Sequence, residues 1–97
     1  MVFGGQIGGI TMLAHRKLAR DYLSKQDRDT FIDIIYKSKV TPLQKEILYM
    51  EFLDDKDHRF IGDTVGLTEN RINHRFGEAY DVIYRYLKKN NILLTLL

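Results

Sequence analysis

The segment from residue 57 to 89 places two capped helical patterns on either side of a glycine. Asp57 precedes a short run that ends at Gly66, and Thr68 precedes a longer run with helical spacing. The side-chain oxygens of Asp57 and Thr68 can accept from the free amides of a starting helix, whereas glycine readily adopts the left-handed conformation that ends one. The sequence therefore predicts a short helix over 58–65, a tight turn, and a second, longer helix.

The longer helix is predicted to have an apolar side and a polar side. Spacings of four, three, four and four place its apolar residues on one stripe, which is Ile72, Phe76, Ala79, Ile83 and Leu87. The opposite face is predicted to carry Asn70, Arg71, His74, Glu78 and Asp81. A short helix, a glycine turn and a long helix in this order are typical of a helix-turn-helix DNA reader, which we expect at 57–89.

A third helix is predicted to begin at Pro42. Thr41 and Gln44 can form a capping box around it, and proline has no amide to leave unpaired at the first helical position. The run from Pro42 to Leu53 is apolar around most of its circumference, which is typical of a helix that is covered on more than one side. The helix-turn-helix can cover only one of these sides, so further helices are needed.

We expect the additional cover from two short amphipathic helices near the N-terminus. The first is predicted to open at Ile10 or Thr11 and to share one face among Leu13 or Ala14, Leu18 and Tyr22. The second is predicted from about Asp27, burying Phe31, Ile34 and Ile35. The predicted fold class is thus all α with about five helices. A single domain spans residues 10–97, behind a flexible glycine-rich arm at 1–9.

Three stretches of the chain resemble region 4 of bacterial sigma factors and the related small phage transcription regulators. They are Thr41-Pro42-Leu43-Gln44-Lys45-Glu46-Ile47-Leu48, then Phe60-Ile61-Gly62-Asp63-Thr64-Val65-Gly66-Leu67-Thr68, then Arg71-Ile72. The resemblance covers about half of the chain. It implies a helix-turn-helix of that type with an N-terminal helical extension, and the same skeleton also serves response-regulator output domains.

The resemblance assigns roles to three positions of the motif. Gly62 falls where the family usually has alanine at a close helix crossing, Gly66 matches the turn glycine, and Ile72 matches the aliphatic anchor of the recognition helix. Sigma factors that read the promoter −35 element usually carry an Arg-Glu pair just after the cap. This chain has Glu69-Asn70 instead. Recognition of the −35 element is therefore not implied.

Polar residues of the motif are the candidates for DNA contact. Amide and guanidinium groups can pair with base edges, so we expect Asn70, Arg71 and His74 to face the bases. Two arginines four residues apart, Arg71 and Arg75, repel each other unless an anion lies nearby. The alternative is that Glu78 neutralises Arg75 and both are ordinary solvated charges. The full set of DNA-binding candidates is Arg59, Thr68, Asn70, Arg71, Asn73, His74 and Arg75, with Arg59, Thr68 and Arg75 available to phosphates.

Composition argues against several other classes of protein. The chain has no cysteine, which excludes disulfides and thiolate metal sites, and no apolar stretch near the roughly 20 residues of a membrane span. The acidic cluster Asp54, Asp55, Asp57 and His58 lacks the glycine and closing glutamate of a calcium loop, so a solvated connector is expected. We expect no metal, no cofactor, no enzymatic activity and a cytoplasmic location.

Charge and the C-terminal tail bear on the partners. The net charge is +2, which is the sum of +3 for residues 1–40 and −1 for residues 41–97. One copy should therefore bind DNA weakly and with strong salt dependence. The tail from Ile92 to Leu97 has no charged side chain. It can fold onto the first helices or join two copies. We expect a homodimer that places two readers on neighbouring half-sites of double-stranded DNA.

The function that these patterns predict is sequence-specific DNA binding by a phage-type transcription regulator. One alternative is a protein-interaction module that uses the same fold to bind RNA polymerase or another regulator through its acidic connector. Another is the DNA-recognition part of a phage packaging subunit, which also combines a helix-turn-helix with oligomerisation.

Overall fold

The computed structural model describes residues 13–92, which form five helices and no strand. The predicted all-α fold with five helices is confirmed. The predicted arm at 1–9 and the tail residues 93–97 lie outside the described range. None of the five helices within 13–92 combines the length and the apolar character that crossing a bilayer demands. The helices are α1 (Ala14–Ser24), α2 (Arg28–Ser38), α3 (Pro42–Phe52), α4 (His58–Val65) and α5 (Glu69–Lys89).

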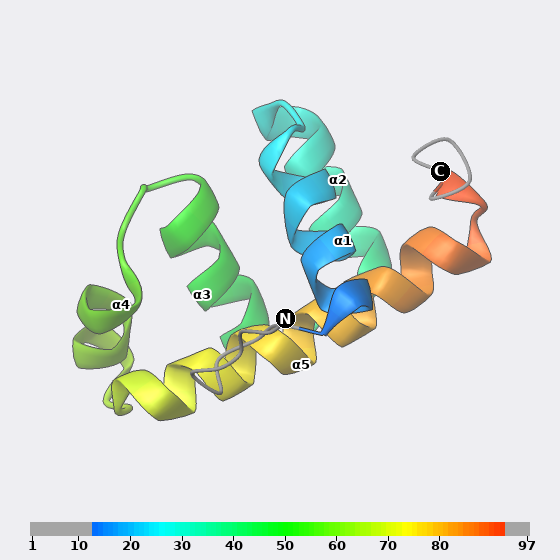
Figure 1. Ribbon diagram of the computed structural model, residues 1–97. Coiled ribbons are helices and arrows are strands. Elements are labelled where there is room, and N and C mark those ends of the chain that lie inside the picture. The colour runs from blue at the N-terminus through cyan, green and yellow to red at the C-terminus, as the bar shows by residue number, and fades with distance from the viewer. Residues whose placement is uncertain (1–12, 93–97) are drawn as a thin grey trace.

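Helix α5 is the axis of the fold. It has 21 residues, and each of the other four helices packs against it, while α3 also contacts α4. Figure 1 shows α5 running along one side of the molecule, with α1 to α4 standing on the other. The predicted apolar stripe is confirmed, because all five of its residues are buried, together with Tyr80. The other helices add Ala19, Leu23, Phe31, Ile34, Ile35, Ile47, Leu48 and Ile61 to this core.

Side-chain caps fix the starts of the four helices α2 to α5. The amide of Thr30 donates to Asp27 at 2.7 Å in α2, and the amide of Phe60 donates to Asp57 at 2.8 Å in α4. In α3 the amide of Gln44 donates to the Thr41 hydroxyl at 3.1 Å, and the Thr41 amide donates back to the Gln44 side chain at 2.9 Å. The predicted capping box is therefore present.

Helix α1 differs from its prediction in both its start and its buried face. It begins at Ala14, because Leu13 has extended backbone angles and offers no side-chain cap. The buried residues are Ala19 and Leu23, whereas Leu18 and Tyr22 are only half-buried. The small side chain of Ala19 allows α1 to approach α5 closely. The predicted face rested mainly on larger apolar residues and did not include Ala19.

Of the two helices predicted to cover the second side of α3, α2 does so, whereas α1 packs mainly against α5. Phe31 is buried, and its ring centroid lies 5.9 Å from that of Tyr49 and 5.4 Å from that of Phe52. Such tilted aromatic pairs stabilise a core beyond the area that they bury. On α3 itself, Ile47 and Leu48 are completely buried. The apolar circumference of α3 is thus shared between α2, α4 and α5.

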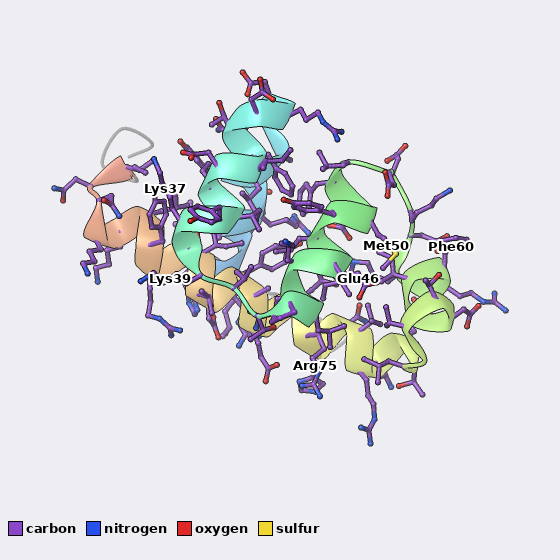
Figure 2. All side chains as sticks on the ribbon, turned by 180° about the vertical axis from the view of Figure 1, so that it is seen from behind. Lys37, Lys39, Glu46, Met50, Phe60 and Arg75 are labelled. Atoms are coloured by element: carbon purple, nitrogen blue, oxygen red, sulfur yellow. The ribbon has the colours of Figure 1, made fainter. Side chains whose placement is uncertain are left out.

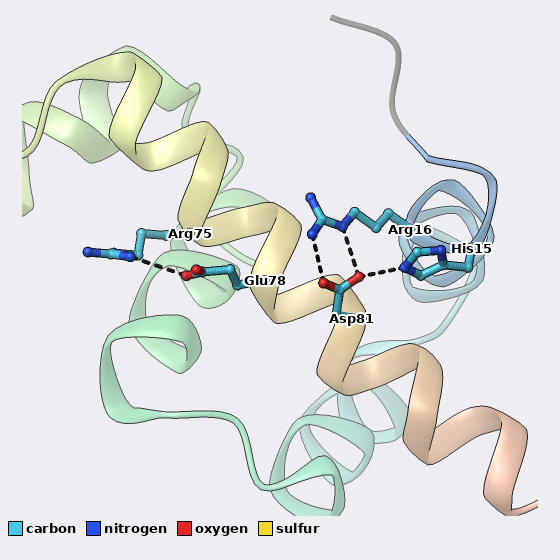
Figure 3. A network of polar contacts seen from close by, with 5 residues as sticks. All are labelled: His15, Arg16, Arg75, Glu78 and Asp81. Atoms are coloured by element: carbon cyan, nitrogen blue, oxygen red, sulfur yellow. Dashed lines mark hydrogen bonds and ion pairs between the residues drawn. The ribbon is translucent and has the colours of Figure 1, made fainter.

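The prediction that Asp81 lies on the open polar face of α5 was wrong, because α1 crosses α5 there. Figure 3 shows Arg16 and His15 of α1 both reaching the Asp81 carboxylate. Arg16 donates from Nε and Nη2 at 2.8 and 2.7 Å, and the Nε2 atom of His15 lies 2.6 Å away. The hydrogen bonds from Arg16 hold the pKa of Asp81 below its ordinary value. Asp81 therefore anchors α1 instead of facing a ligand.

Gly77 makes room for this anchor. A Cβ atom at Gly77 would lie 2.3 Å from Nη1 of Arg16, too close for any real contact. Glycine in the middle of a helix costs about 1 kcal/mol relative to alanine. Its presence in α5 is explained by the passage of the Arg16 side chain over the helix on its way to Asp81.

Candidate nucleic-acid interface

Helices α4 and α5 are joined by a tight turn that depends on two glycines. Gly66 has φ of 81°, as predicted, and the amides of Gly66 and Leu67 both donate to the carbonyl of Gly62, at 2.8 and 2.9 Å. A Cβ atom at Gly62 would lie 2.6 Å from the Leu67 carbonyl oxygen and 3.3 Å from a side-chain carbon of Ile72. The prediction that Gly62 lies where the two helices approach is confirmed. Because Gly62 has no side chain, Leu67 and Ile72 can pack directly against the backbone of α4.

A polar network holds this α4–turn–α5 unit against α3. The His58 ring, from α4, bonds to Glu51 of α3 through Nε2, and its Nδ1 lies 2.5 Å from the side-chain oxygen of Asn73 in α5. The ring also stacks on Phe76, with centroids 4.3 Å apart and planes 7° from parallel. Tyr80 completes the network by donating to Glu51 at 3.3 Å. Three helices are thus tied through one histidine.

The network favours the charged form of His58. A histidine ring donates from both nitrogens only when it is protonated, and both of its partners here present acceptor oxygens. The hydrogen bond to Glu51 raises the pKa of His58 above its ordinary value, against the opposing effect of burial. Burial and the nearby Glu51 charge also raise the pKa of Tyr80, so this phenol stays a hydrogen-bond donor.

The first turns of α5 present side chains that the fold does not use. Asn70, Arg71 and His74 are exposed, and within residues 13–92 none of their side chains has a hydrogen-bond or ion-pair partner. The Thr68 hydroxyl caps the helix by accepting from the Arg71 amide at 3.2 Å. The free amides of a helix N-terminus also favour an anion. This end of α5 can therefore bind a polar, negatively charged ligand.

Two of the remaining candidates, Arg75 and Asn73, are already engaged within the fold. Arg75 donates to Glu78 at 3.2 Å, the pairing seen in Figure 3 and considered as the alternative in the sequence analysis. The side-chain oxygen of Asn73 is engaged by His58, which leaves only its amide nitrogen for another partner. Arg59 of α4 is exposed and has no partner among residues 13–92. Asn70, Arg71, His74 and Arg59 are thus the candidates open to a ligand.

Sequence reasoning missed the network around His58 because its members are scattered. Glu51, His58, Asn73 and Tyr80 come from three helices, and no local spacing relates them. From the sequence, His58 was expected to begin the 58–65 helix and to belong to a solvated polar cluster with Asp54, Asp55 and Asp57. A sequence signal was available in the position of His58. It directly follows the cap residue Asp57, next along the chain to the helix from Pro42 that was expected to be buried.

The chain matches no family model, no curated protein and no solved structure. The resemblance to sigma region 4 therefore depends on the residues quoted above. Within residues 13–92, no group of three or more histidine, cysteine or acidic side chains is placed to hold a metal ion.

Proposed function

We propose that this chain is a sequence-specific DNA-binding transcription regulator that inserts the first turns of α5 into a major groove. One observation carries the proposal. Asn70, Arg71 and His74 are exposed and have no partner within residues 13–92, and they stand at the start of a helix, directly after a short helix and a left-handed glycine turn. The network around His58 ties that end of α5 to α3 and α4, so the helix that presents these side chains is already positioned before DNA binds.

The chemistry of the three side chains suits base edges. Arginine pairs at two points with guanine, asparagine pairs at two points with adenine, and histidine can contact a base or a phosphate. Asn70 and His74 are four residues apart, a rise of about 6 Å along the helix. Base pairs repeat at about 3.4 Å along a strand, so this span corresponds to about two steps.

So short a footprint is insufficient for a regulator that acts alone. We therefore include in the proposal a homodimer that reads two half-sites. The predicted tail contact lies outside the described residues except for Ile92, which is half-buried against the core of its own chain. Sedimentation equilibrium of the full chain at micromolar concentration tests the pairing. A monomer at every concentration would reduce the proposal to a lone reader.

Selection from random duplexes, followed by affinity measurements on the selected site, tests the reading residues. Replacing Arg71 by alanine should weaken binding by about 1–3 kcal/mol and relax preference at one position. Arg28→Ala is the matched control, because Arg28 is exposed at the first turn of α2. The proposal fails if Asn70→Ala and Arg71→Ala both bind the selected site as tightly as this control.

The pairing of Arg75 with Glu78 supplies a second test with the opposite sign. Glu78→Gln removes a negative charge from the reading side of α5 and releases Arg75 for a phosphate. We expect tighter DNA binding and a salt slope that is steeper by about one. In the Arg75→Ala background, Glu78→Gln should leave the salt slope unchanged, because no arginine is paired with Glu78 in that variant.

A second candidate function is protein binding through the connector between α3 and α4 and the first turn of α4. Phe60 is 48% exposed, its ring lies under the ammonium of Lys56 at 4.9 Å, and the neighbouring acidic side chains are exposed. Figure 2 shows Phe60 pointing outward from α4. A partner such as RNA polymerase could contact this aromatic ring. Loss of binding to purified polymerase in Phe60→Ser, with DNA binding unchanged, would favour this second function.

A further inference from the structure

A basic hollow lies at the other end of the molecule from the reading residues. It has a volume of about 320 Å³ and is formed between the end of α2 and the last turns of α5. Figure 2 shows Lys37 and Lys39 at the end of α2, beside the C-terminal half of α5. The lining residues are Lys37, Ser38, Lys39, Val82, Arg85, Tyr86 and Lys89.

About half of the positive charge in this hollow is not neutralised by groups within residues 13–92. Lys37 is paired with Asp33 at 3.1 Å, whereas Lys39, Arg85 and Lys89 have no carboxylate partner among residues 13–92. Cations often balance the partial negative charge at helix C-termini, which amounts to about half a unit per helix. Two helix ends and Asp33 together offset about two of the four positive charges. A net charge of about +2 remains around one small hollow.

We propose that this hollow binds a phosphate group. A phosphate carries one to two negative charges and oxygens that accept from ammonium and guanidinium groups, and Arg85 can engage two oxygens at once. The Ser38 hydroxyl is committed to the carbonyl of Ile34 at 2.7 Å, and the Lys39 amide is committed to Tyr36. Recognition therefore depends mainly on the lysine and arginine side chains that line the hollow. Phosphodiesters should be accepted as well as free phosphate.

The position of the hollow separates it from the proposed base-reading site. Arg71 and Arg85 are fourteen residues apart on α5, a rise of about 21 Å. This exceeds the major-groove width of about 12 Å. A phosphate in the hollow therefore belongs either to a DNA backbone outside the groove that α5 reads or to a soluble phosphate compound. The inference does not depend on the proposed function, because inorganic phosphate tests the site without DNA.

The test uses two double variants that remove the same charges. Lys39→Asn with Arg85→Gln removes one lysine and one arginine from the hollow. Lys39 is the left-handed cap of α2, with φ of 61°, a conformation that asparagine also tolerates, so folding should be retained. Lys25→Gln with Arg28→Gln is the control. It removes one lysine and one arginine from the turn at the opposite end of α2, where both side chains are exposed.

Titration with sodium phosphate, followed by the amide resonances of the ¹⁵N-labelled chain at constant ionic strength, gives the first result. We expect saturable shifts at Lys39, Val82 and Tyr86 that disappear in the Lys39→Asn, Arg85→Gln variant and persist in the control. Shifts no larger than those caused by chloride, or shifts that survive in the hollow variant, would overturn the proposal.

Binding of a non-specific DNA duplex over a range of salt concentrations distinguishes the two sources of phosphate. Each phosphate contact contributes about 0.9 to the slope of log affinity against log salt. A slope that falls by about 0.9 or more in the hollow variant, but not in the control, assigns the hollow to the DNA backbone. An unchanged slope together with lost phosphate shifts assigns it to a soluble phosphate compound. If the wild-type chain binds no DNA, the proposed function fails while the phosphate titration still decides this site.

Discussion

Gly77 offers the sharpest test of how α1 is anchored to α5. Alanine at this position should gain about 1 kcal/mol of helix stability over glycine. The added methyl would lie 2.3 Å from Nη1 and 3.1 Å from Cζ of Arg16, and the guanidinium must therefore move. Moving it breaks two hydrogen bonds to Asp81, in a pair whose side chains are only 28% and 27% exposed. We take this loss as about 1–2 kcal/mol, above the range for fully exposed ion pairs.

The two effects nearly cancel in the wild-type chain, so Gly77→Ala alone should change the free energy of unfolding by 1 kcal/mol or less. Arg16→Met removes the conflict while keeping the apolar stem. A methionine ends at the position of the arginine Nε atom, which lies 3.6 Å from the added methyl, an ordinary contact. In the Arg16→Met background, Gly77→Ala should therefore show the full stabilisation of about 1 kcal/mol. The expected coupling is about 1–2 kcal/mol.

Urea unfolding followed by circular dichroism measures this cycle. The midpoints give the coupling if the denaturant slope m is the same in all four proteins. Equal stabilisation by Gly77→Ala in both backgrounds would refute the reasoning, since Arg16 would then have no need of the glycine. Asp81→Asn in place of Arg16→Met is a second route to the same result. It weakens the anchor from the other side without touching the contact with Gly77.

Three further predictions concern the α4–turn–α5 unit. The hydrogen bond to Glu51 raises the pKa of His58 above its ordinary 6.5, so the stabilisation is fully present below that pH and is lost as the pH rises through the folded value. Urea midpoints between about pH 6 and about pH 9 should therefore fall more steeply for the wild type than for His58→Gln. Gly62→Ala should destabilise by about 1–3 kcal/mol, although alanine is the better helix former, because its methyl would lie 2.6 Å from the Leu67 carbonyl. Gly66→Val should cost about 1 kcal/mol or more, and Gly66→Asn less, because asparagine tolerates the left-handed φ of 81°.

Each of these has a clear contrary result. Parallel pH curves for the wild type and His58→Gln would mean that the histidine contributes no pH-dependent stability. A urea midpoint for Gly62→Ala at or above that of the wild type would show that the Leu67 carbonyl can move to admit the methyl group. The alanine that the sigma region 4 family usually has at this position would agree with that result. If Gly66→Val and Gly66→Asn have the same urea midpoint, the left-handed backbone conformation at Gly66 does not determine the stability of the turn.

The features that the sequence predicted correctly depend on residues close together in the chain. The caps at Asp57 and Thr68 and the turn at Gly66 each involve atoms within about four positions, and all three appear as expected. The apolar stripe of α5 is equally local, because a helix places every third or fourth residue on one side. These signals sufficed for the all-α fold and for the bounds of α4 and α5.

The features that it did not predict join distant residues. Arg16 and Asp81 are 65 positions apart, and Tyr80 and Glu51 are 29 apart. A carboxylate such as Asp81 looks like a solvated charge until the helix that crosses it is known. For the same reason, the reading of Asn73 changes once His58 is found beside it. Charge and polarity indicate where a side chain can interact, but only the packing of helices decides its partner.

Because α5 is the common partner of the other four helices, the order of synthesis matters for this chain. A ribosome makes α1 before α5, and Arg16 precedes its acceptor Asp81 by 65 residues. At about 5–20 residues per second, α1 waits about 3 to 13 seconds for the surface on which it packs. During that interval the apolar sides of the early helices have no α5 to cover them. The four earlier helices can therefore dock on α5 only late in synthesis. Until then their apolar sides remain open to chaperones.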